Sequence, residues 1–357
     1  MSASKKPSKR FDQAMDGRPR RISLKVLADS LGLSPATVSL VMNQAPTADS
    51  IPRATQERIF AAAREMNYRP SFSARWARTA RSFTIGVLVP EVSEGYAAMV
   101  MSGIEGHLLR EGYFYLVASH RHRDDLIDEY PRLLMGRLVD GMIAVDTPWH
   151  HELPVPVVTV SGHTRSNAVT NLVLDHDRAA ELALSHLRHL GHKAIAFIKG
   201  QEFSSDTAAR WESIVKMAAR LGLEVSPKLT VQLEGDLASP ELGYRVTRRL
   251  LGARTRFTAL FAFNDVSAIG AIEALRHHKL DVPKDVSVVG FDDIQGAAYH
   301  SPQLTTVRQP LKKMGTIAAE ALLRRIARPD DDTYSREIVI EPELIVRKST
   351  AQVSTSG

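Results

Sequence analysis

The chain contains no cysteine among its 357 residues. This absence excludes disulfide bonds, zinc sites built on thiolates and cysteine nucleophiles. No stretch approaches the roughly 20 apolar residues that a membrane span requires. No apolar run of the signal-peptide type follows the basic start of the sequence. We therefore expect a cytoplasmic protein.

Signatures of catalysis are also missing from the sequence. No glycine-rich phosphate loop follows a predicted strand, and no Gly-x-Ser-x-Gly nucleophile elbow occurs. His186, His189 and His192 are grouped. No carboxylate or cysteine stands at a ligand spacing beside them, so a role at a helix end is favoured over metal binding. The sequence predicts no enzyme, no metal and no cofactor.

Positive charge is concentrated at the front of the chain. Residues 1–83 hold 15 Lys and Arg against 6 Asp and Glu, a net charge of +9, whereas the other 274 residues hold 31 against 34, a net charge of −3. A basic front end on a mildly acidic body indicates a polyanionic partner. A membrane surface is disfavoured because no basic amphipathic helix with a broad apolar face occurs there. Nucleic acid is the favoured partner.

Residues 23–43 have the pattern of two short helices joined by a tight turn. Apolar residues recur at helical spacing over 24–31, and Gly32 stands where the chain must turn. Ser34 suits the N-cap of the second helix and Pro35 its first position. Such a pair exposes a small helix that fits the major groove of DNA, although short helical hairpins also occur inside ordinary cores. The outward-facing residues would be Pro35, Ala36, Thr37, Ser39, Leu40 and Asn43.

A third helix is predicted from Pro52, with Ile59 and Met66 on the apolar face that closes a small three-helix core. The basic segment 71–82 that follows is either a plain tether or a hinge that contacts DNA phosphates or the minor groove. Residues 1–20, rich in Ser, Lys, Arg and Pro, are expected to form a disordered basic tail.

The body of the chain alternates short apolar strands with amphipathic helices. Strands are predicted at 85–89, 114–118, 141–145, 155–160, 194–198, 229–233, 259–263 and 286–290. Helices are predicted at 99–112, 126–138, 178–190, 209–221, 242–251 and 266–277. This order implies an α/β fold with parallel sheets flanked by helices on both faces. Two such sheets in tandem make two lobes, and ligands bind beyond the carboxyl ends of the strands, in the cleft.

Several of these segments resemble the lactose/galactose-repressor (LacI/GalR) family. They are residues 23–43, 51–59, 67–70 and 74–75 at the front, and 84–90, 288–293 and 304–310 in the body. The resemblance extends to about residue 349. It implies a helix-turn-helix transcriptional regulator, most often a repressor, with a two-lobed core that resembles periplasmic sugar-binding proteins. It also implies a small-molecule effector and a homodimer on a pseudo-palindromic operator of double-stranded DNA.

The resemblance sets expected domain boundaries. The helix-turn-helix headpiece would span 21–69, the hinge 70–83, the core 84–349 and a polar tail 350–357. Within the core, the first lobe would comprise 84–161 and 308–335, and the second 162–307 and 336–349. Because the tail is polar and short, without the apolar heptads of the family's tetramers, we expect a dimer.

The resemblance also assigns DNA contacts. They fall on Ser23, Ser34, Pro35, Ala36, Thr37, Ser39, Leu40, Asn43, Arg75, Trp76 and Ala77. The chain departs from the family pattern at Val26, where an aspartate is usual, and its loop before the third helix is longer. The family's hinge leucine, which wedges into the minor groove, falls at Ala77. Either Trp76 supplies the wedge or the operator is kinked less, and the helical register favours the weaker kink.

Effector contacts are implied for a further set of residues. They are Tyr96, Asp146, Thr147, Trp149, Ser161, Ser204, Asp206, Arg210 and Asp265. Arg210 matches the family's ligand-binding arginine, Asp265 matches an acceptor of ligand hydrogen bonds, and Trp149 could stack on a sugar face. Each could instead be an ordinary surface or capping residue. A lining of serine, aspartate and arginine favours a polyhydroxylated ligand.

Two other functions are open at this stage. A solute sensor without a DNA role would have the same core, but the basic front end argues against it. A sugar-modifying enzyme would need catalytic motifs that the sequence lacks.

Overall fold

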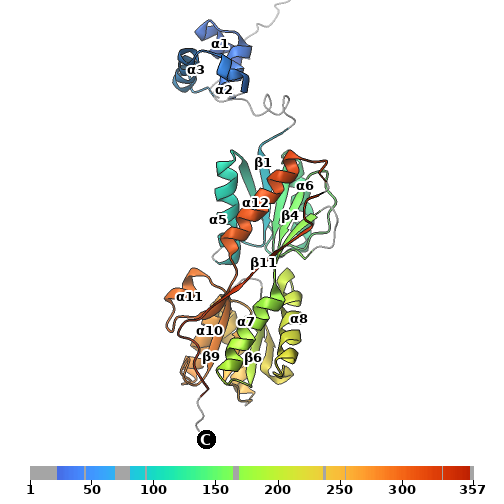
Figure 1. Cartoon of the computed structure of the whole chain (residues 1–357), viewed down its shortest axis with the longest axis vertical. Helices are drawn as coiled ribbons and strands as arrows, with labels where there is room; N and C mark the ends of the chain where they lie inside the picture. The colour runs from blue at the N-terminus through green and yellow to red at the C-terminus, as the bar shows by residue number, and fades with distance from the viewer. Residues whose placement is uncertain are drawn as a thin grey trace, which may run out of the picture. The chain divides into compact units, whose positions relative to one another are not determined.

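The computed structural model describes residues 22–43, 46–68, 81–92, 95–163, 169–235, 239–253, 255–331 and 333–353. The chain divides into two compact units, Met1–Ser82 and Phe83–Gly357. The elements of each unit are labelled in Figure 1. The tail at 1–20 and the predicted hinge contacts Arg75, Trp76 and Ala77 lie outside the described residues.

The first unit is the predicted helix-turn-helix with a third helix. Its elements are α1 (Leu24–Leu31), α2 (Pro35–Met42), the 3₁₀ turn η1 (Pro46–Ser50) and α3 (Arg53–Glu65). Gly32, with a φ of 66°, ends α1, and Ser34 caps α2 by accepting a hydrogen bond from the Thr37 N–H at 3.0 Å. Pro52 is the N-cap of α3, one position before the place expected for it. The core joins Leu27, Ala28, Val38, Val41, Ile59 and Ala63.

Among the described residues, no single helix is long and apolar enough to cross a membrane. The pair α1 and α2 reaches that length and composition only together, with a bend of 109° between the two helices.

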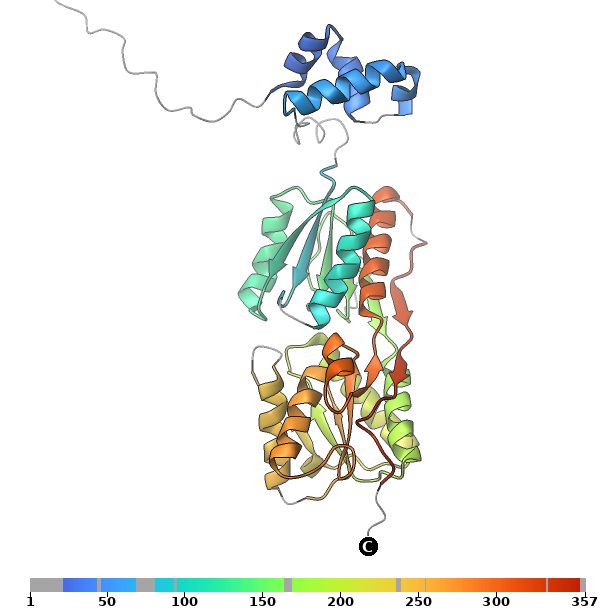
Figure 2. The ribbon, with the colours of Figure 1, turned by 90° about the vertical axis from the view of Figure 1, so that its left-hand side faces the viewer.

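The second unit contains two six-stranded sheets, one in each lobe. The first sheet has the order β11-β5-β4-β3-β1-β2, with every pair parallel. Its strands are β1 (Thr84–Val89), β2 (Phe114–Ser119), β3 (Gly141–Val145), β4 (Val157–Val160), β5 (Val169–Leu174) and β11 (Glu337–Ile340). Three helices pack on it: α5 (Tyr96–Arg110), α6 (Asp124–Met135) and α12 (Leu311–Ala327). Figure 2 shows α6 on one face and α5 with α12 on the other.

The second sheet has the order β12-β10-β9-β8-β6-β7, and only β12 runs antiparallel to its neighbour. Its strands are β6 (Ile195–Lys199), β7 (Thr230–Gln232), β8 (Ala259–Ala262), β9 (Ser287–Asp292), β10 (Thr305–Arg308) and β12 (Glu343–Ile345). The helical elements of this lobe are α7 (His176–His189), α8 (Ser205–Arg220), η2 (Pro227–Leu229), α9 (Pro240–Gly252), α10 (Asp265–His277) and α11 (Gln295–Tyr299).

The lobe boundaries differ from those expected. Strand β5 lies beyond residue 161 yet belongs to the first sheet, and β11 also joins that sheet by pairing with β5, with Glu337 opposite Asn171. The chain therefore passes between the lobes after β5, after β10 and after β11. The expected boundary at 161/162 and the assignment of all of 336–349 to the second lobe are wrong, because the hydrogen bonding of β5 and β11 extends the first sheet.

Each lobe contains a helix pair that crosses at reciprocal glycines. A methyl group added at Gly103 of α5 would overlap the Lys312 carbonyl oxygen of α12, and one at Gly315 would overlap the Val100 carbonyl oxygen. In the second lobe, Gly243 of α9 and Gly270 of α10 face the partner helix's backbone in the same way. Glycine is required at these positions because the backbones approach too closely for any Cβ.

Candidate functional site

A pocket of about 760 Å³, partly open to solvent, lies between the two lobes. First-lobe residues follow β1 and β3, and second-lobe residues come from the ends of β6, β8 and β9 and from the start of α8. The pocket therefore lies at the carboxyl ends of both parallel sheets, as expected for this fold. The predicted residues that line it are Tyr96, Asp146, Ser204, Asp206 and Arg210.

Asp146 joins the two lobes. It follows β3, and its Oδ1 accepts hydrogen bonds from the Ser204 hydroxyl at 3.2 Å and from the Ser205 N–H and hydroxyl at 3.0 and 2.6 Å, at the start of α8. Burial, together with the charge of nearby Asp206, raises the pKa of Asp146 from 3.8 to about 7. A carboxyl whose pKa lies near neutral pH therefore forms a polar link between the lobes.

Asp206 is the anionic centre of the pocket. Its Oδ2 accepts from Arg210 Nη2 at 3.0 Å, and its Oδ1 lies 2.7 Å from His163 Nε2 and 3.3 Å from His176 Nε2. Burial alone would raise the pKa of Asp206. The charge of His176, the hydrogen bonds from both histidines and the charge of Arg210 together hold that pKa well below its usual range. The carboxylate in turn raises the pKa of His163, against the effect of burial.

Arg210 is buried with 4% of its surface exposed. Its guanidinium lies 3.7 Å from the ring centroid of Phe291 and 4.4 Å from that of Phe263, and Nη1 donates to the Phe263 carbonyl at 2.6 Å. Within the described part of the chain, its Nε has no hydrogen-bond partner. A buried charged donor without a partner is costly, which indicates a polar group that is supplied by a ligand.

Asp292 adds a second weakly acidic carboxyl at the end of β9. Its Oδ1 accepts from Gln309 Nε2 at 2.6 Å. Burial raises its pKa from 3.8 to about 7, although Arg210 and the Gln309 hydrogen bond act in the opposite direction. The pocket thus offers both hydrogen-bond donors and acceptors at neutral pH.

The remaining predicted effector residues lie outside the pocket lining. Ser161 is buried next to it, and its hydroxyl shares a 2.8 Å hydrogen bond with the Tyr96 hydroxyl. Thr147 is also buried, and its hydroxyl donates to the Val145 carbonyl at 2.8 Å and lies 2.9 Å from His120 Nε2.

Trp149 and Asp265 are corrections to the expected placement. The Trp149 indole packs in an apolar cluster of the first lobe, and Nε1 donates to the His151 carbonyl at 2.9 Å, so it does not face the pocket. Asp265 accepts from the Thr306 hydroxyl at 2.6 Å and the Ile294 N–H at 2.9 Å. These bonds engage both carboxyl oxygens beneath the pocket, and the adjacent Asn264 and Val266 line it instead.

Sequence reasoning missed the lining residue Asp292 and several residues that contact the pocket's carboxylates. His163 and His176 lie on either side of β5, a strand that was not predicted, so nothing indicated that both would face Asp206. Ser205 is adjacent to the predicted Ser204. Asp292 ends a predicted strand, and this position was a usable signal for a residue at the cleft.

The headpiece presents its predicted contacts at the surface. Ser23, Ser34, Pro35 and Ala36 are exposed, and Thr37, Ser39, Leu40 and Asn43 are partly exposed. The Asn43 amide donates to the Ser39 carbonyl at 2.6 Å and the Ser39 hydroxyl at 3.2 Å, so it is already engaged within the helix end.

Comparisons with known proteins agree with this architecture. Residues 23–71 match the family described as bacterial regulatory proteins, lacI family, and residues 184–350 match a periplasmic binding protein-like domain. The HTH-type transcriptional repressor PurR of Haemophilus influenzae is 32% identical over 342 residues, which cover 93% of this chain and 99% of that protein. This chain belongs to the LacI family.

Solved structures of other LacI-type regulators have the same fold. The lac repressor dimer bound to operator and the anti-inducer ONPF is 25% identical with a TM-score of 0.79, over 93% of this chain and 100% of that one. The complex of the transcriptional regulator CelR with cellobiose is 27% identical with a TM-score of 0.68, over 92% and 100%. The LacI-family chain described here is thus a DNA-binding transcriptional repressor under the control of a small molecule, and not an enzyme.

Proposed function

We propose that this repressor binds a polyhydroxylated small molecule, a sugar or sugar derivative, in the pocket between its lobes. The observation that carries the proposal is the convergence of the unpartnered Arg210 Nε, the Asp146 and Asp292 carboxyls and the Ser204 hydroxyl around one cavity. Closely spaced donors and acceptors match the alternating hydroxyl groups of a sugar. A relative in complex with cellobiose supports this class of ligand.

Ligand binding acts on the contacts between the lobes. Asp146 of the first lobe is held by Ser204 and Ser205 of the second, so a ligand hydroxyl that competes for any of these groups alters the link between them. A ligand shifts such an equilibrium only by its difference in affinity for the two arrangements. The difference in ligand affinity between the two lobe arrangements arises at the hydrogen bonds that cross between the lobes.

On the DNA side, α2 is the recognition helix of each copy. A homodimer places two such helices on a pseudo-palindromic operator, one in each half-site. The lac repressor dimer bound to operator supports this assembly. A repressor of this kind works in the bacterial cytoplasm, because the operator is there.

The proposal is tested by a thermal-shift screen of the full chain against sugars, sugar acids, polyols and nucleosides. A sugar-class compound is expected to raise the melting temperature. R210K is expected to weaken its binding by at least about 10-fold, because lysine lacks the planar fork and the aromatic stacking of the guanidinium. The matched control R220K changes an exposed arginine on the same helix and is expected to bind as the parent protein does. A hit list without polyhydroxylated compounds, or equal binding by R210K, would reject this ligand class.

A further inference from the structure

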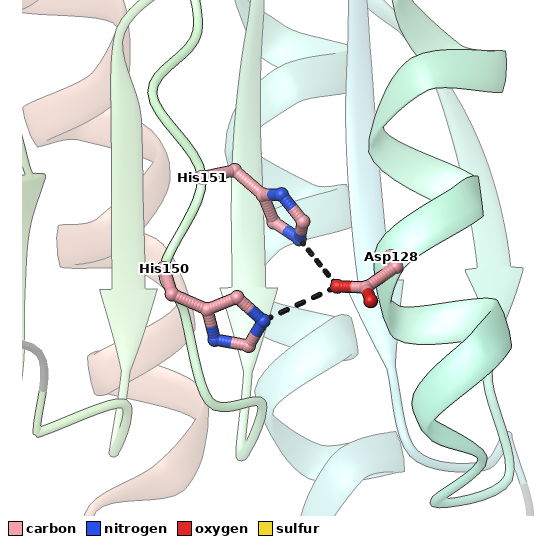
Figure 3. A group of neighbouring side chains, drawn as sticks. All are labelled: Asp128, His150 and His151. Atoms are coloured by element: carbon pink, nitrogen blue, oxygen red, sulfur yellow. Dashed lines mark hydrogen bonds and ion pairs between the residues drawn. The ribbon is translucent and has the colours of Figure 1, made fainter.

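Outside the pocket, Asp128, His150 and His151 converge on the surface of the first lobe. Asp128 lies on α6, and the two histidines lie in the segment between β3 and β4. Figure 3 shows both imidazole rings directed at one carboxylate oxygen. His150 Nε2 is 3.2 Å from Asp128 Oδ1, and His151 Nε2 is 3.5 Å from the same atom.

The spacing of these atoms suits a tetrahedral zinc ion. Zinc binds imidazole nitrogen and carboxylate oxygen at about 2.0–2.1 Å, which separates neighbouring ligand atoms by about 3.3 Å. The two measured nitrogen–oxygen distances, 3.2 and 3.5 Å, lie on either side of that value. All three ligand atoms lie within 4.8 Å of one another.

One ligand is already held in position. The His151 side chain is 14% exposed, and its ring meets Trp149 edge-on with centroids 5.3 Å apart. The Trp149 indole N–H donates to the His151 carbonyl at 2.9 Å. Among the described residues, the buried His151 Nε2 has no hydrogen-bond partner. Its ion-pair partner, Asp128 Oδ1, lies 3.5 Å away, and a metal ion between the two atoms would bind both.

The other two ligands keep the site open to metal from solution. The side chains of His150 and Asp128 are 62% and 56% exposed. We propose that Asp128, His150 and His151 form a zinc site, in which water takes the fourth position. Two imidazoles and one carboxylate are a ligand set that zinc accepts, whereas magnesium and calcium prefer oxygen ligands alone.

Bound zinc would connect α6 to the segment between β3 and β4. That segment begins with Asp146, whose side chain holds the second lobe. Zinc would therefore restrain the chain between the metal site and the effector pocket. The direct consequence is slower hydrogen exchange in residues 146–151 when zinc is present.

A second cluster of the same residue types serves as an internal comparison. Within the described part of the chain, His163, His176 and Asp206 also come together. Arg210 donates to the other oxygen of the Asp206 carboxylate at 3.0 Å there, so a positive charge already pairs with that carboxylate and disfavours a cation. We therefore expect one zinc ion per chain, bound at the surface cluster.

The experiment is calorimetric titration of the full, tag-free and chelator-treated protein with zinc chloride. The parent protein is expected to bind one equivalent. H150A and D128N alter exposed side chains and should each bind at least about 10-fold more weakly. The matched control H277A removes a histidine of similar exposure, 57%, which pairs with Glu273 but belongs, among the described residues, to no group of three metal-ligating side chains. It should bind as the parent does.

The absorption spectrum of bound Co²⁺ tests the coordination geometry of the site independently. Tetrahedral Co²⁺ absorbs strongly in the visible range, so the parent protein should show these bands and H150A should not. The proposal is overturned if the parent takes up no zinc, if both H150A and D128N bind as the parent does, or if H163A rather than H150A abolishes binding.

Discussion

At the scale of single residues, Arg210 and Asp206 set the electrostatics of the pocket. The guanidinium is stacked between Phe263 and Phe291, and its pairing with Asp206 leaves the pocket's other carboxyls short of positive partners. Burial then raises the pKa values of Asp146 and Asp292 to about 7. Protonation near neutral pH is therefore a property of these two carboxyls in the pocket.

A pH dependence of stability follows from Asp146. Its pKa is about 7 in the folded protein and 3.8 without burial, so its contribution is complete below about pH 4 and is lost as the pH rises through 7. We expect D146N to be more stable than the parent at pH 8, by about 1–2 kcal/mol for a partly exposed group, and the difference to fall to less than about half of that value at pH 5. Urea denaturation at both pH values measures this.

The stabilities are compared only at pH 5 and above, because the effect of Asp206 on stability has the opposite pH dependence. The pKa of Asp206 is held low, so its contribution is lost only at acidic pH. The control D330N alters an exposed aspartate and should leave the pH profile unchanged. A profile for D146N parallel to that of the parent would show that Asp146 does not titrate in this range.

Family resemblance indicated Asp146, which follows β3, and Arg210, within α8, as cleft residues, and both line the pocket. Trp149 does not, because the apolar surface of its indole is better buried beside Leu134 and Val157 in the first lobe's core. The aspartate at 265 packs beneath the pocket, since the close approach of Gly290 and the Thr306 hydroxyl holds its carboxyl there. A sequence pattern gives the position of a residue along a strand, but not which of its neighbours takes up its hydrogen bonds.

At the scale of elements, the helix pair α5 and α12 depends on two glycines. Gly103 is in backbone contact with α12, whereas Gly106, on the same helix, has only the end of the Arg110 side chain within 4 Å of an added methyl group. The two positions form a matched pair for mutation.

We expect G103A to destabilise the core by about 1–3 kcal/mol, because the helices must separate to admit the methyl group. G106A is expected to be neutral or to stabilise by up to about 1 kcal/mol, through the better helix propensity of alanine. Thermal and urea unfolding measure both. Equal stability of the two variants would contradict the close crossing of α5 and α12.

We predict that the recognition helix α2 discriminates only modestly between bases. Its exposed Ala36 and partly exposed Leu40 cannot form paired hydrogen bonds with a base, and the Asn43 amide is engaged with Ser39. Readout should depend on thymine methyl groups and backbone contacts. We expect each base-pair substitution in the operator beneath this helix to cost less than about 1 kcal/mol of binding free energy. Several sharply fixed guanines in a binding-site selection would contradict this reading.

Strands with an unbroken apolar run were predictable, whereas the fully buried β5 was missed because Thr170 and Asn171 interrupt its run. The fully buried strands β1, β3 and β8 were found from their apolar runs. The strand β11 has an exposed, mixed pattern, and β12 has only three residues, so neither carries a clear signal. Both become strands because a neighbouring edge, β5 or β10, supplies their hydrogen bonds.

At the scale of the whole molecule, the return of β11 to the first sheet is the feature that sequence reasoning could not supply. Strand β5 pairs with the neighbouring β4, whereas β11 reaches the first sheet only by pairing with β5, far away along the chain, with Glu337 opposite Asn171. The chain crosses from one lobe to the other after β5, after β10 and after β11, and these segments connect the two lobes. The pocket lies between lobes that these connections join, which suits it to a change of lobe arrangement on ligand binding.

We expect the pocket between the lobes to control the affinity of the headpiece for DNA. The most direct measurement is the affinity of the full chain for its selected operator, by fluorescence anisotropy at fixed salt, with and without the effector found by the thermal screen. We predict a change of at least about 5-fold on effector addition, and an R210K variant that binds operator as the parent does but no longer responds. Equal, weak and salt-sensitive binding to every duplex, with or without effector, would contradict the account.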